Sequence, residues 1–191
     1  MSNYEVFSDK IRDTKKMYIE IEAKLKVDSL NETAEKLAEL GASFMTEQNQ
    51  KDYYFDDLQS TFAGTDSCLR IRQQKDNGGE KIFLTYKGPK QKDNFKKRAE
   101  IEIEVNDFET AQKLLLALRY KESIVVEKRR QLWRFGDCLV VLDDVSDLGG
   151  FVEIEGPDDK KIAEVQKRLG LENLQHISRS YADLLAENLH S

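Results

Sequence analysis

The sequence predicts an α+β protein in which eight antiparallel strands close into a barrel, or tunnel, with helices packed outside. Apolar and charged residues alternate along six segments, so each has one apolar and one charged face. Short turns join most segments, which favours antiparallel pairing. An open sheet would place like charges side by side at an energetic cost, whereas a closed sheet turns the charged faces toward a hydrated lumen and leaves the apolar faces to amphipathic helices.

Composition limits the classes of function. The chain has 191 residues, which suits one domain, and 30 basic against 36 acidic residues give a net charge of −6. This balance argues against a nucleic-acid partner held by bulk positive charge. No apolar run is long enough to cross a membrane, and residues 1–16 lack the apolar core of a signal peptide. We expect a polar extension over residues 1–16, one domain over residues 17–191, a cytoplasmic location and no membrane partner.

The first strand is predicted over Met17–Val27. Its apolar side chains alternate with four charged ones, Glu20, Glu22, Lys24 and Lys26. Asp28 and Ser29 then open a helix that Gly41 closes. The next strand, over residues 42–56, ends in the aromatic run Tyr53-Tyr54-Phe55.

The middle of the chain continues the alternation. Residues 58–66 are expected to form a loop, and the turn Asn77-Gly78-Gly79 joins strands over residues 68–74 and 81–87. A further strand is predicted over residues 98–105. The charged faces of these three strands carry Arg70 and Arg72, then Lys87, then Arg98, Glu100 and Glu102.

The last third is predicted to contain three strands, over residues 123–135, 138–144 and 151–155, and helices over residues 107–118, 158–169 and 178–189. Because side chains alternate along a strand, Lys128 and Arg130 share one face while Arg129 points away. The same rule separates Asp143 from Asp144 and places Glu153 and Glu155 together.

A lumen lined by both cations and carboxylates needs a ligand with matching parts. Arginine and lysine suit phosphate oxygens, and carboxylates beside them are explained if they hold a divalent cation that bridges to the phosphates. The predicted cluster is all oxygen, which favours Mg²⁺ or Mn²⁺. Cys68 and Cys138 lie in apolar runs without a CxxC pair, so reduced thiols are expected. No P-loop, GxGxxG or nucleophile elbow is present.

The charged strands resemble a known family. Glu20-Ile21-Glu22-Ala23-Lys24 is similar to the ExExK signature of the CYTH superfamily, the triphosphate tunnel metalloenzymes. Further segments resemble the family in the same order: YYFD at residues 53–56, LRIR at 69–72, LTYKGP at 84–89, 98–102, LDDVSDLGGFVEIE at 142–155 and the C-terminal Ser180-Tyr181 with Leu184-Leu185. The resemblance covers about residues 17 to 186 and is nearest to the class IV adenylyl cyclase, or CyaB-like, branch.

The resemblance implies roles for individual residues. It implies metal ligation by Glu20, Glu22, Glu153 and Glu155, and triphosphate binding by Lys24, Arg70, Arg72, Lys87, Lys128 and Arg130. Asp143 would sit among the cations as a metal or water partner. Glu100, Glu102 and Arg98 would line the tunnel, with the two glutamates around a second metal. Glu20, Glu22, Lys24, Lys87, Lys128, Arg130, Asp143 and Glu153 form the expected catalytic set.

The resemblance implies one of several activities. The first expectation is an adenylate cyclase that converts ATP to cyclic AMP and pyrophosphate. Hydrolysis of inorganic tripolyphosphate or thiamine triphosphate is the alternative, and a non-catalytic polyphosphate- or nucleotide-binding module is a third. Phe83, Tyr53 and Phe151 are candidates to contact an organic group, although packing is the more usual role of such residues. Trp133 lies on the face opposite Lys128 and Arg130. The family also implies a homodimer.

Overall fold

The computed structural model describes residues 18–89 and 96–189, without the side chains of residues 18–20, 63 and 96–98. The predicted extension at residues 1–16 lies outside this range, as do the side chains of Glu20 and Arg98.

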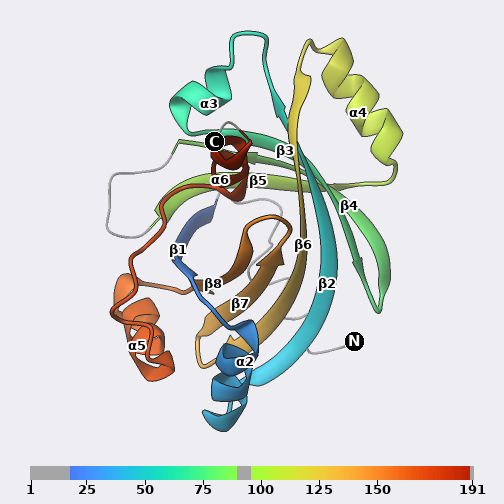
Figure 1. The fold of residues 1–191 in the computed structure, drawn as a ribbon. Helices are drawn as coiled ribbons and strands as arrows, with labels where there is room; N and C mark the ends of the chain where they lie inside the picture. The colour runs from blue at the N-terminus through green and yellow to red at the C-terminus, as the bar shows by residue number, and fades with distance from the viewer. Residues whose placement is uncertain (1–17, 90–95, 190–191) are drawn as a thin grey trace.

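The described strands form one closed antiparallel barrel, as the charge alternation predicts (Figure 1). Their order around the barrel is β1-β5-β4-β3-β2-β6-β7-β8, and β1 closes the ring by pairing with both β5 and β8. The strands are β1 Tyr18–Lys26, β2 Ser43–Asp56, β3 Cys68–Asp76, β4 Gly79–Lys87, β5 Lys96–Val105, β6 Lys121–Phe135, β7 Cys138–Val145 and β8 Gly149–Glu155. Because the sheet is closed, one face of each strand points into the lumen and the other face points outward.

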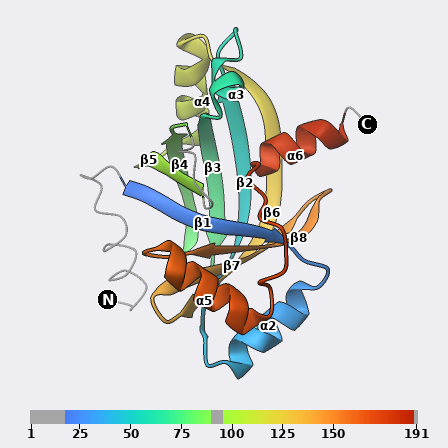
Figure 2. The same cartoon turned by 90° about the vertical axis from the view of Figure 1, so that its left-hand side faces the viewer.

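Helices surround the barrel, and α2 and α5 lie together on one side of it (Figure 2). The described helices are α2 Leu30–Glu39, α3 Thr61–Thr65, α4 Phe108–Ala117, α5 Asp159–Leu169 and α6 Tyr181–Asn188. The helix α6 differs from the others, because its Tyr181 and Leu185 pack on side chains that share a strand face with the lumen residues. Side-chain oxygens of the four residues Ser29, Asp107, Asp158 and Ser180 accept backbone N–H groups at the starts of α2, α4, α5 and α6. Such caps satisfy donors that have no partner within the helix.

The short helix α3 corrects the expectation of a loop over residues 58–66. The carboxylate of Asp57 accepts the backbone N–H groups of Gln59 and Thr61 at 2.9 and 3.0 Å, which starts a single helical turn. A five-residue helix is too short to show an apolar stripe, so the sequence pattern did not reveal it.

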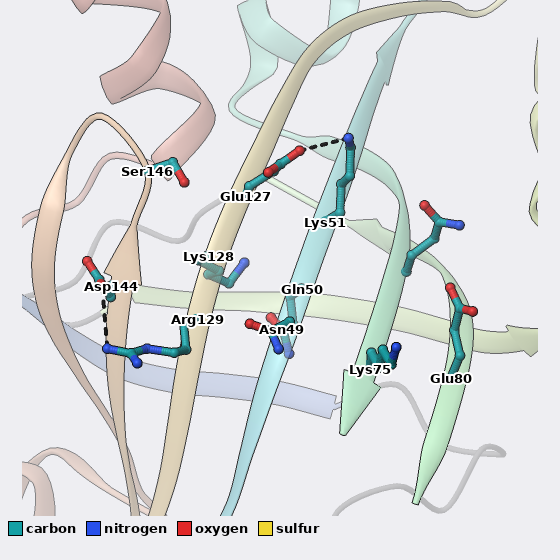
Figure 3. A pocket seen from close by; sticks show the side chains of 11 residues that line it. Asn49, Gln50, Lys51, Lys75, Glu80, Glu127, Lys128, Arg129, Asp144 and Ser146 are labelled. Atoms are coloured by element: carbon teal, nitrogen blue, oxygen red, sulfur yellow. Dashed lines mark ion pairs between the residues drawn. The ribbon is translucent and has the colours of Figure 1, made fainter. Parts of the chain in front are cut away.

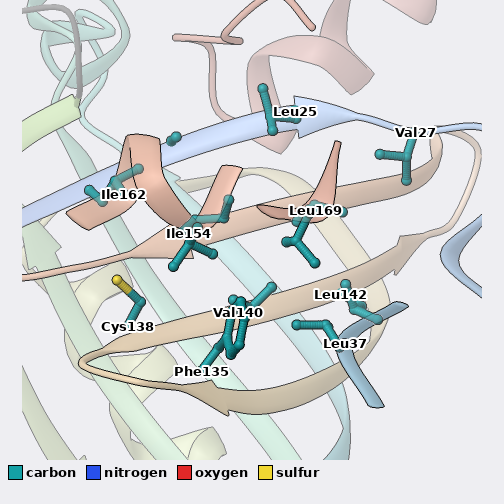
Figure 4. Packing of buried hydrophobic residues seen from close by; sticks show 13 residues of the cluster. Leu25, Val27, Leu37, Phe135, Cys138, Val140, Leu142, Ile154, Ile162 and Leu169 are labelled. Atoms are coloured by element: carbon teal, nitrogen blue, oxygen red, sulfur yellow. The ribbon is translucent and has the colours of Figure 1, made fainter. Parts of the chain in front are cut away.

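The largest apolar core lies outside the barrel, between the sheet and the helices α2 and α5 (Figure 4). Leu25 and Ile154 from the strands pack with Leu37 of α2 and Ile162 of α5, and all four are fully buried. Burial of such a side chain contributes about 1.5–3 kcal/mol. The core is placed where helices meet the apolar strand faces, which leaves the inner face free for polar groups.

Candidate active site in the barrel lumen

The charged strand faces turn into the lumen. Glu22, Lys24, Arg70, Arg72, Lys87, Lys128, Asp143 and Glu153 are buried, while Arg130, Glu155, Glu100 and Glu102 are half-buried. Nine of these predicted residues line one cavity: Glu22, Lys24, Arg70, Arg72, Lys87, Lys128, Arg130, Glu153 and Glu155. The volume of this cavity is about 60 Å³, and Tyr181 is also among its lining residues.

Side-chain parity separates lumen residues from surface residues as expected. Arg129 and Asp144 are exposed and form an ion pair of 3.7 Å on the outer face. They border an open groove on β2, β3, β4, β6 and β7, where Lys51 and Glu127 also pair at 2.7 Å (Figure 3). The next residue on β6, Lys128, is 5% exposed and belongs to the lumen.

An acidic cluster lies where β1 meets β8. Carboxylate oxygens of Glu22, Glu153 and Glu155 lie within 4.8 Å of one another. The register explains the meeting, because Glu22 is directly opposite Glu155 and Lys24 is opposite Glu153. Three carboxylates this close repel each other unless a cation is shared, and an all-oxygen set suits Mg²⁺ or Mn²⁺. The residues present therefore fit the expected metal.

Both carboxylate oxygens of Asp143 accept hydrogen bonds, and this residue lies outside the acidic cluster. Its two oxygens accept hydrogen bonds from Nε and Nη2 of Arg130 at 2.6 and 2.5 Å, and Tyr181 Oη donates a third at 2.8 Å. Asp143 therefore lies beside a cation, as expected, and its role as a metal or water partner stays a prediction. Arg130 Nη2 also donates to Glu153 at 2.7 Å, so it links Asp143 to the acidic cluster.

Tyr181, the first residue of α6, contributes to the lumen and was not expected in the site. Its ring is 5% exposed, and Lys24 Nζ lies 3.9 Å from the ring centroid. Lys24 also donates to the backbone oxygen of Arg179 at 3.3 Å and pairs with Glu153 at 3.2 Å. The sequence identifies Ser180-Tyr181 as part of a segment that resembles the family's C-terminal helix, but only the folded chain brings that helix to the cavity.

Asp52 of β2 is the second residue that the sequence analysis missed. It is fully buried and lies among three cations, Arg70, Arg72 and Lys128. Polar residues at every second position of β2, Gln48, Gln50 and Asp52, were the available signal. The sequence pattern did not reveal them, because Gln48 and Gln50 are uncharged and this strand lacks the regular alternation of charged and apolar residues that its neighbours show.

Arg70 and Lys128 have properties that bear on the binding of an anion. Arg70 Nε is buried without a hydrogen-bond partner, which is costly unless a ligand accepts from it. Lys128 is buried, and this desolvation, together with nearby Arg72 and Arg130, lowers its pKa from 10.5 to about 7, although Asp52 and Asp143 oppose the change. The lumen therefore holds one lysine whose charge changes near neutral pH.

Glu100 and Glu102 face β4 and take no part in the acidic cluster. Burial disfavours the charge of Glu100, but Lys87 and Arg70 outweigh it and lower the Glu100 pKa, with Lys87 Nζ at 2.8 Å. Glu102 accepts a hydrogen bond from Thr85 at 2.9 Å. A second metal around these two residues stays a prediction.

Some of the aromatic residues that were candidates to contact an organic group pack against other rings, and others lie on a lumen-facing strand face. Tyr53 packs on Phe108 and Phe151 on Tyr181, with centroids 4.5 and 5.0 Å apart. Phe83 is 5% exposed, on the strand face of Thr85 and Lys87. Trp133 packs edge-on against Phe44 and outside the lumen, as parity predicts. Cys68 and Cys138 carry reduced thiols.

Comparison with known proteins identifies the family. The CYTH domain model matches residues 18–181, which is most of the chain. The chain belongs to the CYTH family. It is 35% identical to the "Putative adenylate cyclase MJ0240" of Methanocaldococcus jannaschii, over 87% of this chain and 98% of that protein. It is 27% identical to the adenylate cyclase CyaB of Aeromonas hydrophila, over 89% and 90% of the two chains.

A solved structure shares this CYTH fold. The PH1819 protein of Pyrococcus horikoshii superposes with a TM-score of 0.77 at 35% identity, covering 88% of this chain and 99% of that one. Among the described helices, none combines the length and apolar content that a membrane crossing requires. The homodimer and the cytoplasmic location stay predictions.

Proposed function

We propose that this CYTH protein is a divalent-metal-dependent enzyme that acts on a triphosphate inside the barrel, and that its reaction is the conversion of ATP to cyclic AMP and pyrophosphate. One observation carries the proposal: a three-carboxylate cluster and a set of buried cations line the same cavity. Carboxylates would repel a bare triphosphate, whereas a metal ion held by them attracts it.

The residues of the lumen would bind the triphosphate and neutralise its negative charge. Glu22, Glu153 and Glu155 would hold Mg²⁺ or Mn²⁺, with Glu20 expected beside them on β1. Lys24, Arg70, Arg72, Lys87, Lys128 and Arg130 would bind the phosphate oxygens. Arginine can bind two oxygens at once, while lysine acts as a point charge. The metal, when bound, neutralises charge that develops on the phosphate oxygens.

In the cyclase reaction the ribose 3′-oxygen forms a bond to the α-phosphorus. The bond from that phosphorus to the pyrophosphate oxygen breaks, and the 3′-hydroxyl proton is released. Catalysis of this kind depends mostly on positioning and electrostatic stabilisation. The names of the two adenylate cyclase relatives, each matched over at least 90% of its length, support the choice of ATP.

A second candidate is hydrolysis of a terminal phosphate, with tripolyphosphate or thiamine triphosphate as substrate. The lining favours it in one respect, because Tyr54 and Tyr181 are the aromatic residues among the side chains that line the cavity. Tyr181 already packs on Phe151, lies beside Lys24 Nζ and donates to Asp143, so these contacts occupy its ring and hydroxyl. Within this second candidate, the lining therefore favours tripolyphosphate, which has no organic group, over thiamine triphosphate.

Product analysis separates these reactions. Purified protein is incubated with Mg²⁺ or Mn²⁺ and, in turn, with ATP, thiamine triphosphate and tripolyphosphate. Cyclic AMP with an equal amount of pyrophosphate supports the cyclase, and orthophosphate from the other substrates supports hydrolysis. Tight binding with no turnover of any substrate would replace both proposals with a non-catalytic binding module. The Glu22→Gln variant controls for contaminating enzymes, since its loss of activity assigns turnover to the lumen.

A further inference from the structure

Asp52 holds three cationic side chains from two other strands. Its carboxylate accepts hydrogen bonds from Nε and Nη2 of Arg72 at 2.6 and 2.8 Å, and from Lys128 Nζ at 2.6 Å. Arg70 Nη1 lies at 3.4 Å. Register explains the meeting: Asp52 is opposite Arg72 on β3, and its neighbour Gln50 is opposite Lys128 on β6.

Asp52 stands behind the cations as seen from the cavity. Arg70, Arg72 and Lys128 line the cavity, whereas Asp52 is fully buried and is absent from its lining. Its single negative charge leaves the three cations with excess positive charge, so they can still bind an anion. A buried carboxylate with two bonds to one guanidinium also fixes the direction in which that guanidinium points.

We propose that Asp52 is a positioning residue that aims Arg70, Arg72 and Lys128 at the triphosphate and balances their mutual repulsion while the cavity is empty. The inference rests on the proposed triphosphate site. It gives a role to a residue that touches neither the cavity nor the acidic cluster.

The charge of Lys128 gives this role a distinctive signature. The charged groups that act on Lys128 are Asp52 on β2, Arg72 on β3, Arg130 on β6 and Asp143 on β7. Arg70 on β3 shares Asp52 with Lys128, and the Tyr181 ring of α6 lies 5.7 Å from Lys128 Nζ. Lys24, Lys87, Glu22, Glu153 and Glu155 line the same cavity. Asp52 is the largest of the influences that favour the protonated form of Lys128. Removal of the Asp52 charge should therefore make Lys128 lose its proton at a lower pH.

The test is isothermal titration of tripolyphosphate, with Mg²⁺, into wild type and Asp52→Asn at about pH 6 and about pH 8. If the variant lowers the Lys128 pKa by one unit, the ratio of variant to wild-type Kd is expected to rise from about twofold at the lower pH to about tenfold at the higher. Because each value is a ratio of the variant Kd to the wild-type Kd, the effect of protons that tripolyphosphate itself gains or loses cancels. Circular dichroism first establishes that each variant is folded.

Three further variants separate positioning from folding. Asp52→Glu keeps the charge, so its Kd ratio should not depend on pH. Lys128→Arg cannot deprotonate, so Asp52→Asn in that background should lose the pH-dependent part of its effect. Asp144→Asn removes an exposed carboxylate on the outer face and should bind like wild type.

The outcomes are distinct. A Kd for Asp52→Asn equal to wild type at both pH values, or a pH-independent loss, overturns the inference, as does failure of both Asp52 variants to fold. Lack of turnover with the expected Kd pattern would overturn the enzymatic function and leave the role of Asp52 intact. Failure of the wild type to bind either tripolyphosphate or ATP would overturn both.

Discussion

Tyr181 donates a hydrogen bond of 2.8 Å to the buried carboxylate of Asp143, which joins the start of α6 to the wall of the lumen. Asp143 in turn holds Arg130 through two hydrogen bonds. The C-terminal helix is thereby coupled to a cation of the proposed phosphate site, although the two are far apart in sequence.

Replacing Tyr181 with Phe should cost about 1 kcal/mol in the free energy of unfolding, because one buried hydrogen bond is lost while the ring still packs on Phe151. Urea denaturation measures this difference. Tyr86→Phe, on an exposed ring outside the barrel, is the matched control and should change stability little. A Tyr181→Phe protein as stable as the control would show that the hydrogen bond contributes nothing.

Neighbouring arginines on β6 should differ strongly in their contribution to stability. Arg130→Gln leaves the fully buried Asp143 without its cation and is expected to cost about 3–5 kcal/mol. Arg129→Gln breaks only an exposed pair with Asp144 and should cost about 0–1 kcal/mol. Equal urea midpoints for the two variants would contradict the parity assignment.

The acidic cluster should respond to metal in a way that needs no activity assay. Glu22→Gln removes one of the three carboxylates of the cluster and with it one proposed metal ligand. Adding Mg²⁺ or Mn²⁺ should raise the Tm of wild type, since a ligand that binds the folded state stabilises it, and should raise that of the variant less. Glu127→Gln, outside the barrel, should keep the full metal-induced rise. An equal rise in wild type and Glu22→Gln would mean that metal binds elsewhere.

Lys128 should make the metal-free protein more stable as pH rises above neutrality. Burial, with Arg72 and Arg130, lowers its folded pKa to about 7, whereas the unfolded value is 10.5. Between these values the unfolded chain binds more protons, so the free energy of unfolding increases with pH, by at most about 1.4 kcal/mol per pH unit. Urea denaturation from about pH 7 to about pH 8.5 measures the slope. Lys128→Arg should flatten it, and an unchanged slope in that variant would assign the effect to another group.

Side-chain alternation allowed much of the lumen to be predicted from sequence. Because the period of a strand is two, the sequence separates Lys128 and Arg130 from Arg129, and it places Glu153 with Glu155. These assignments agree with the burial in the structure. Alternation does not tell which strands meet, so the closeness of Glu22 to both Glu153 and Glu155 could not be derived from it.

The sequence by itself determined the barrel class, the inward charged faces and the family, because these depend on local periodicity and on ordered motifs. Only the tertiary structure decided which opposite charges pair. Asp52 and Lys128 are 76 residues apart and form their hydrogen bond because β2 and β6 are neighbours in the closed sheet. Likewise Tyr181 reaches Asp143 only after α6 docks on the barrel, since contacts of this range arise from packing and leave no periodic trace in the sequence.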